Sequence, residues 1–336
     1  MLRFATVSAM ALATALPALA QEVNLYSGRH YDTDLVIFDR FTEETGIKVN
    51  ILDGSGDELQ ARIEAEGANS PADLFWTVDG GRLHRAIEAG IFQPAESDVL
   101  NERIPEDMRH PDGLFYGVTS RARVIYYNAE AGMPEGVTTY EDLARDDLGH
   151  SVCIRTSSNI YNVSLMAEMV HVHGAEDAQA WAEGLLGNLA RDPQGGDTDQ
   201  IRGVAAGECD LAVANTYYWG RLQTSTNPAD REVASKVLPI FPNQDGRGTH
   251  VNVSGIGVVA NAPNPDNAVR FIEFLSTPFV QSILADSNNE YPVVEDTTIA
   301  GPMRDWADFK RSDTNIADYG TNQAAAIEAW DRAAFP

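Results

Sequence analysis

Hydrophobic positions recur along the first hundred residues with two alternating periods. Alternation with a period of two favours a strand, and a stripe repeating every three or four residues favours a helix. In chain order the pattern predicts a strand, a helix, a strand, a helix and a strand over residues 23–27, 35–46, 47–52, 57–66 and 72–76. This succession is typical of parallel βαβ units, so we expect the segment to form an α/β domain.

The same succession returns in the middle of the chain. It predicts two strands with three helices between them, over residues 151–155, 160–174, 178–189, 200–206 and 210–214. Two long extended runs, 121–128 and 251–259, lie before and after this second unit, and further helices are expected from Ala268 and Phe279. Because such a run can cross from one domain into another, we expect the far end of the chain to complete the first domain.

The first twenty residues have the composition of a secretory signal peptide. Arg3 is their single charge, residues 4–16 are apolar and rich in alanine, and a small-x-small site at 18–20 precedes Gln21. The apolar run is too short to cross a membrane, so we expect cleavage near Gln21 and export. No later stretch is long and apolar enough to cross a bilayer, and the mature form is expected to be soluble.

The chain of 336 residues is acidic, with Lys+Arg 24, Asp+Glu 50 and a formal net charge of -26. A surface of this sign repels nucleic acid and anionic lipid head groups, which argues against both as partners. The length exceeds that of a single hydrophobic core, which favours two domains.

The two cysteines, Cys153 and Cys209, each lie at the edge of a predicted strand. An exported chain meets an oxidising compartment, so we expect them to form a disulfide. A thiolate metal site or a nucleophilic cysteine is the less favoured interpretation, because the chain has no CxxC spacing and no histidine beside either cysteine.

Two adjacent tyrosines, Tyr217 and Tyr218, follow the predicted strand 210–214 at the point where the chain turns at Asn215. Loops at the carboxyl ends of parallel strands open into the crevice where α/β proteins bind ligands. Two phenols there can bind a hard metal ion, stack on a sugar or fill an apolar wall. Taken alone, the pair favours packing, since tyrosine is often half buried with its hydroxyl in water.

Seven short segments together carry a family resemblance, over residues 25–34, 72–75, 124–128, 157–162, 207–212, 215–218 and 289–293. In this order, and with a leader and two crossings, they resemble the type 2 periplasmic solute-binding proteins of ABC importers, and among those the ferric-iron-binding proteins of the FutA/FbpA type. The resemblance implies two α/β lobes, each a mixed sheet flanked by helices, with a cleft between them. It divides the chain into a signal peptide over 1–20, a first lobe over 21–119 plus about 250–298, and a second lobe over 120–249 plus about 299–336.

In that family iron lies between the lobes, held by a His-Tyr pair from the first lobe and three tyrosines from the second. The resemblance places these roles on His30, Tyr31, Tyr161, Tyr217 and Tyr218. In some members the histidine is not a ligand, and carbonate or water completes the coordination. The resemblance further implies a monomeric periplasmic protein, not an enzyme, that delivers Fe(3+) to a membrane ABC permease.

The chemistry of ferric ion agrees with phenol ligands. The ion is small, hard and highly charged, and ligand type is one means by which sites choose metals. A free phenol has a pKa of about 10, yet a bound cation can expel the proton. Up to four phenolates would exceed a trivalent ion by about one charge, so a nearby cation is expected. Arg29, Arg121 and Arg202 are candidates by their loop positions, and for each an ordinary ion-pairing role stays open.

Local sequence also separates the candidate tyrosines from the others. Tyr161 follows the capping sequence 157–159, so it should lie in the first turn of a helix, where the helix dipole favours a phenolate. Tyr126 and Tyr127 lie inside an apolar run and are expected to pack, while Tyr26 and Tyr291 are expected to line the cleft or hinge. His171 and His173 would face different directions of a helix, which excludes them as a metal pair.

Two alternatives differ in function class. A receptor of the same fold for a sugar, polyamine or organic anion would use the tyrosines and tryptophans to stack on its ligand. An exported hydrolase is disfavoured, because the chain has no GxSxG, no HExxH and no motif-supported Ser/His/Asp set.

Overall fold

The computed structural model describes residues 21–29 and 33–336, so the predicted signal peptide lies outside the described residues. The first part of the chain forms the predicted βαβ units: β1 pairs in parallel with β2 and with β3. Its elements are β1 (Glu22–Ser27), α1 (Asp34–Thr45), β2 (Lys48–Asp53), α2 (Gly56–Glu66), β3 (Leu74–Val78), α3 (Gly80–Glu88), β4 (Phe92–Gln93) and α4 (Asp98–Arg103).

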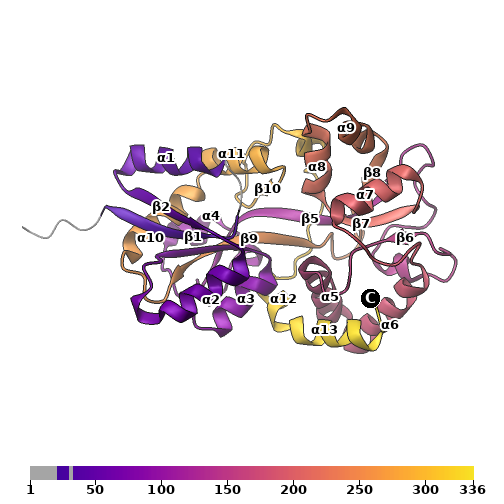
Figure 1. The fold of residues 1–336 in the computed structure, drawn as a ribbon, viewed down its shortest axis with the longest axis horizontal. Helices are drawn as coiled ribbons and strands as arrows, with labels where there is room; N and C mark the ends of the chain where they lie inside the picture. The colour runs from indigo at the N-terminus through magenta and orange to yellow at the C-terminus, as the bar shows by residue number, and fades with distance from the viewer. Residues whose placement is uncertain (1–20, 30–32) are drawn as a thin grey trace, which may run out of the picture.

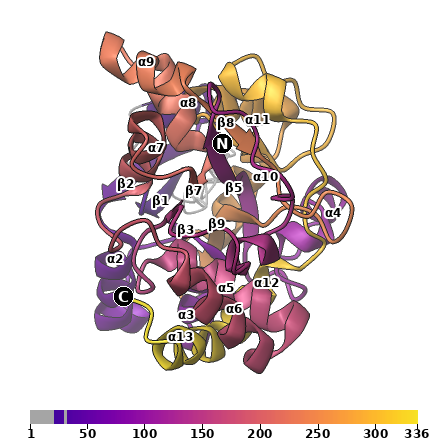
Figure 2. The same cartoon turned by 90° about the vertical axis from the view of Figure 1, so that its right-hand side faces the viewer.

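The middle of the chain forms the second α/β unit. Its elements are β5 (Tyr116–Asn128), β6 (Val152–Cys153), α5 (Ile160–His173), α6 (Ala175–Gly187), α7 (Asp197–Ala206), β7 (Leu211–Asn215), α8 (Thr216–Thr224), α9 (Pro228–Ser235) and β8 (Val237–Ile240). In both views the strands lie between α8 and α9 on one side and α5 and α6 on the other (Figures 1 and 2).

The last part of the chain returns to both units. Its elements are β9 (Val251–Val259), α10 (Pro265–Leu275), α11 (Pro278–Asn288), β10 (Tyr291–Pro292), α12 (Ile316–Thr321) and α13 (Gln323–Arg332). Strand β9 pairs with β3, so the far end of the chain completes the first sheet, as the sequence predicts. Helix α12 contacts α3 of the first unit and α5 of the second, and α13 packs on α5 and α6.

Two long strands, β5 and β9, connect the units (Figure 1). The path of neighbouring strands runs β2-β1-β3-β9-β5-β7-β6. Residues 116–122 of β5 pair with β9, whereas residues 123–128 pair with β7 and β8, so β5 changes sheets between Ala122 and Arg123. The change of partner places Arg121 and Arg123 on either side of the junction. The residue boundaries of the two lobes stay a prediction.

Helix α1 shows how local sequence sets the packing and where the pattern misleads. Ile37, Phe38 and Phe41 are buried, and the Phe41 ring meets the Phe271 ring edge-on with centroids 5.0 Å apart. Leu35, which the predicted stripe included, is 49% exposed, because steps of about 100° per residue turn it away from these three positions. Gly46 ends the helix with φ 71°, a conformation that glycine adopts without steric cost.

The predicted disulfide is confirmed: Cys153 of β6 is bonded to Cys209, which lies just before β7. The two strands are parallel neighbours, and the Cα atoms are 5.9 Å apart. Among the described residues no single helix is long and apolar enough to cross a membrane. Helices α10 and α11 pass that test only as a pair, and the pair is bent by 71°.

Candidate metal site

Three of the five predicted ligands come together in the second unit. Tyr161 lies in the first turn of α5, and Tyr217 and Tyr218 lie in the first turn of α8. The Tyr217 hydroxyl donates to the Tyr161 hydroxyl over 3.1 Å, and the rings of Tyr217 and Tyr218 lie 4.3 Å apart between centroids. His30 and Tyr31 lie outside the described residues, so their roles stay a prediction.

Short polar segments bring these phenols to one place. Asn159 caps α5, and its side-chain oxygen accepts from the backbone N–H of Tyr161 over 3.1 Å. Asn215 is still extended, with φ -75° and ψ 147°, and the chain turns into α8 at Thr216. The turn lets two adjacent side chains meet, which a regular strand would forbid. The phenols therefore lie at the amino-terminal ends of two helices, where the helix dipoles favour negative charge.

Burial holds Tyr217 and Tyr218 in their neutral form. It raises the pKa of Tyr217 well above its usual value, and the neighbouring Tyr161 and Tyr218 raise it further, while Arg121 lowers it. Burial also raises the pKa of Tyr218, and Tyr161 adds to the effect. Both groups are therefore neutral at pH 7, and only a strong charge such as a bound cation would expel their protons.

Two guanidinium groups lie over the Tyr217 and Tyr218 rings. Arg221 is 4.9 Å from the Tyr217 ring centroid and 5.6 Å from that of Tyr218, and Arg121 is 5.8 Å from the Tyr217 centroid. The sequence analysis named Arg121 and missed Arg221. Its spacing was a usable signal, since residues three and four apart on a helix lie on the same face.

A buried arginine, Arg123, ties the two tyrosine-bearing segments together. Its guanidinium donates to Asn162 over 2.6 Å and to Asn215 over 2.9 Å, and it pairs with Asp197 at 3.2 Å. Asp197 also accepts from the backbone N–H of Asn215 over 2.8 Å. The side chain of Arg123 is 1% exposed and lies 5.9 Å from the Tyr161 ring centroid. Arg123 therefore fixes the start of α5 relative to the start of α8.

The other predicted cations occupy different surroundings. Arg29 is buried and pairs with Asp34 at 3.1 Å and with Glu290 at 3.3 Å, and Glu290 also pairs with Arg121 at 2.5 Å. This group links the first unit to Arg121 beside Tyr217. Arg202 lies on α7 with its side chain 48% exposed, in an ion pair with Asp230 at 2.9 Å. That contact is the ion-pairing role that the sequence left open.

The remaining tyrosines have other partners. Tyr126 is fully buried, in agreement with packing. The Tyr26 hydroxyl donates to Glu66 over 3.0 Å, and the Tyr291 hydroxyl donates to the Trp306 carbonyl over 3.0 Å. The hydroxyls of Tyr26 and Tyr291 thus bond to Glu66 and to the Trp306 carbonyl, and not to the three clustered phenols.

The described histidines do not make a conventional metal site. His171 and His173 are exposed on α5, and His173 pairs with Glu141 at 2.7 Å. His250 is buried against the carboxylate of Glu168. Within residues 21–29 and 33–336, no three His, Cys, Asp or Glu side chains are grouped where they could hold a metal ion.

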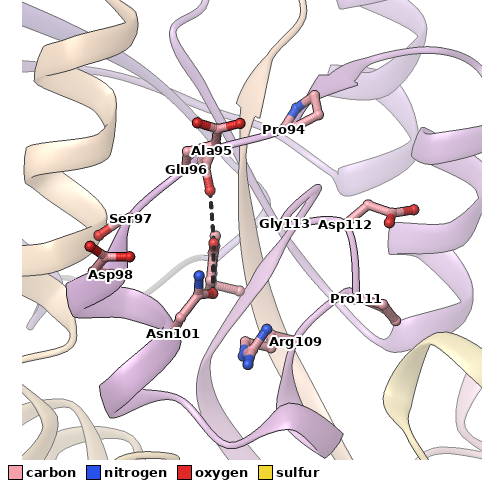
Figure 3. Close-up of a pocket in the computed structure, with 11 residues that line it drawn as sticks. Pro94, Ala95, Glu96, Ser97, Asp98, Asn101, Arg109, Pro111, Asp112 and Gly113 are labelled. Atoms are coloured by element: carbon pink, nitrogen blue, oxygen red, sulfur yellow. Dashed lines mark hydrogen bonds between the residues drawn. The ribbon is translucent and has the colours of Figure 1, made fainter.

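A separate polar cavity of about 560 Å³ lies in the first unit (Figure 3). Its wall includes Glu96, Asp98, Arg109 and Asp112, and the Tyr116 hydroxyl braces it by donating to the Ala95 carbonyl over 2.8 Å. None of the three clustered tyrosines lines this cavity, so it is not part of the candidate metal site.

Comparisons with known proteins show which family the chain resembles along most of its length. The profile of a family described as "Bacterial extracellular solute-binding protein" matches residues 69–319. "Iron uptake protein A1" of Synechocystis sp. is 50% identical over 319 residues, which cover 95% of this chain and 89% of that protein. The "Major ferric iron-binding protein" of Neisseria gonorrhoeae is 27% identical over 87% of this chain and 86% of its own length.

Two solved structures are similar over nearly the whole chain. The Trichodesmium protein titled "(IdiA) (FutA) in complex with iron and citrate ligands" is 51% identical with a TM-score of 0.92, over 94% of this chain and 100% of that one. The ferric binding protein of Campylobacter jejuni is 41% identical with a TM-score of 0.86, again over 94% and 100%. These similarities confirm the predicted two-lobed α/β fold. The chain is a member of the bacterial extracellular solute-binding protein family.

Proposed function

We propose that this protein binds ferric ion between its two lobes and delivers it to an ABC permease in the membrane. The observation that carries the proposal is the 3.1 Å contact between the hydroxyls of Tyr161 and Tyr217, with the tilted ring of Tyr218 4.3 Å from that of Tyr217. Three phenols that converge at the amino-terminal ends of two helices suit a hard, highly charged cation. The names of the similar iron-uptake and ferric-binding proteins support the same ligand.

In the proposed site the three clustered tyrosines bind as phenolates, together with Tyr31 and His30 from the first lobe. A carbonate or a water molecule completes the coordination. Four phenolates exceed the ferric charge by about one unit, and Arg121 and Arg221 beside the rings offset the excess. Metal binding releases the phenol protons, which couples affinity to pH.

Because the proposed ligands come from both lobes, ferric ion binds the closed form more tightly and shifts the population toward it. Closure would then signal the loaded state to the permease. The protein would act in the periplasm after loss of residues 1–20, as a monomeric binding protein and not as an enzyme. Protonation of the phenolates, reduction of the iron or opening by the permease would release the metal.

Equilibrium dialysis against ferric citrate tests the proposal. We expect a single ferric ion per wild-type chain, and loss of tight binding in the triple variant Tyr161→Phe/Tyr217→Phe/Tyr218→Phe. A wild-type chain that takes up no iron, or a triple variant that retains it fully, would contradict the proposal. Thermal shifts with a sugar, a polyamine or an organic anion on the same protein would then identify a receptor for one of those ligands.

A further inference from the structure

A strained residue lies at the junction between the two lobes. Asp79, which caps α3 directly after β3, has φ 82° and ψ 131° and is 2% exposed. This conformation lies outside the left-handed helical region that aspartate tolerates, and such a residue persists only where its surroundings hold it in place. A buried outlier of this kind points to a constraint beyond ordinary packing.

The Asp79 carboxylate collects hydrogen bonds from three parts of the chain. It accepts from the Ser164 hydroxyl of α5 over 2.6 Å, from the Asn252 amide of β9 over 3.0 Å and from the backbone N–H of Gly81 over 2.9 Å. Asn252 in turn accepts from the backbone N–H of Gly80 over 2.8 Å. One buried carboxylate thus joins the first unit, a connecting strand and a helix of the second unit.

These contacts link the two sides of the proposed metal site. Ser164 lies one turn after Tyr161 on α5, so the position of its hydroxyl fixes the start of that helix. Asp79 follows β3, whose Trp76 pairs with Ser27 at the end of β1, the strand that leads into the segment carrying His30 and Tyr31. The Asp79–Ser164 contact therefore connects the carboxyl end of β3 in the first lobe to the helix that presents a phenol of the second.

Close packing against α12 fixes the position of α3 relative to the Asp79–Ser164 contact. A side chain at Gly80 would come within 2.7 Å of the Ile316 carbonyl of α12, and one at Gly320 within 2.0 Å of His84 on α3. Since α12 also contacts α5, the three helices form one packed group around the carboxylate. If the lobes rotated about this group of helices, the distance between Asp79 and Ser164 would stay the same.

We infer that Ser164 and Asp79 are positioning residues for ferric-ion binding, and that their hydrogen bond sets the separation of Tyr161 from the first lobe in the closed form. This inference rests on the proposed function. It adds two residues that position the ligands without binding the metal themselves. Neither residue bonds to the three phenols in the structure. Their effect would act through α5 and the relative position of the lobes.

The test compares Ser164→Ala with Ser97→Ala. The Ser97 hydroxyl also donates to a carboxylate, Glu273, over 2.7 Å, but both residues belong to the first lobe. Ferric affinity is measured by competition with citrate, and the closure on iron addition by small-angle scattering. We expect Ser164→Ala to bind iron about tenfold more weakly and to close less completely, and Ser97→Ala to match the wild type in both measurements.

A second variant, at the other end of the hydrogen bond, keeps the inference testable if Ser164→Ala does not fold. Asp79→Asn keeps an oxygen for Ser164 but turns an amide toward Asn252, and we expect weaker binding here too. The visible absorption maximum of the iron complex should not move in either variant, because the ligands are unchanged. Wild-type affinity and closure in folded Ser164→Ala or Asp79→Asn would overturn the inference, whereas a wild-type chain that binds no iron would overturn the proposed function instead.

Discussion

Two clusters, one buried and one partly buried, lie on either side of the point where β5 changes sheets, and they differ in how their charges arise. On one side, Arg29 and Arg121 surround Glu290, and Asp34 pairs with Arg29, so two positive and two negative formal charges compensate one another. On the other side, Tyr161, Tyr217 and Tyr218 are phenols that carry charge only after they lose protons. Two arginines of the same strand contact these clusters. Arg121 pairs with Glu290 and also lies 5.8 Å from the Tyr217 ring centroid, whereas Arg123 bonds only on the tyrosine side, to Asn162 and Asn215.

The comparison separates a structural cluster from the cluster that we propose to bind the ligand. Burial opposes ionisation of Glu290, yet the guanidinium groups of Arg121 and Arg29 hold the pKa of its carboxyl below the usual value. Burial raises the pKa of Tyr217, with little to oppose it except Arg121. The carboxylate cluster is thus charged from the start, and the phenol cluster becomes charged when a cation arrives. Changes in the first should alter stability, and changes in the second should alter iron binding.

Acidification should have the largest effect on ferric affinity, because each phenol that loses a proton on binding adds to the pH dependence. If three phenols each lose a proton on binding, ferric affinity falls by up to about a thousandfold per pH unit as the pH is lowered. The slope is measured by citrate competition between pH 6 and 8, with correction for the protonation of citrate. A slope of zero would contradict phenolate ligands.

Glu290→Gln should have the next largest effect, on stability. The variant leaves Arg29 and Arg121 buried without their shared carboxylate, which costs about 3 kcal/mol. Urea unfolding of the apo protein measures the loss. Because the folded-state pKa of Glu290 is lowered, its contribution is present above the unfolded-state pKa and disappears as the pH falls through the folded-state pKa. If Glu290→Gln were as stable as the wild type at pH 7, or lost iron binding without losing stability, the two clusters would not differ in the way we describe.

Removal of a single phenol hydroxyl should weaken iron binding and leave stability nearly unchanged, which is the opposite of the result expected for Glu290→Gln. We expect Tyr217→Phe and Tyr218→Phe each to weaken ferric binding about a hundredfold, while the rings continue to pack and stability changes by less than about 1 kcal/mol. Tyr127→Phe is the matched control, since it comes from an adjacent pair of tyrosines outside the cluster. Equal effects of all three variants would show that phenol hydroxyls contribute only to the fold.

Arg221→Gln should have the smallest effect. The change removes a cation 4.9 Å from the Tyr217 ring and leaves the ligands in place, so we expect about tenfold weaker iron binding. Arg202→Gln is the control, because that arginine pairs with Asp230 at the surface. The two variants are compared in the same citrate competition, and a larger loss in Arg202→Gln would reverse our assignment of the charge-compensating group.

The meeting of Tyr161 with Tyr217 and Tyr218 was implied by the family resemblance, whereas local pattern was sufficient to predict the alternating α/β elements, the two crossings and the disulfide. Periodicity and short motifs report on neighbouring residues, and these features follow from them. Arg123 and Asp79 could not be found this way, because their partners lie far away in the sequence: Asn215 is 92 residues from Arg123, and Asn252 is 173 residues from Asp79.

The visible spectrum during titration with ferric ion tests the central claim most directly, since a phenolate bound to ferric ion absorbs visible light by charge transfer. We predict that the wild type develops a coloured band that saturates with a single ion per chain. The band should lose intensity in each of Tyr161→Phe, Tyr217→Phe and Tyr218→Phe, and remain in Tyr127→Phe. A colourless iron complex, or an identical band in all three cluster variants, would contradict the claim that these phenols bind the metal.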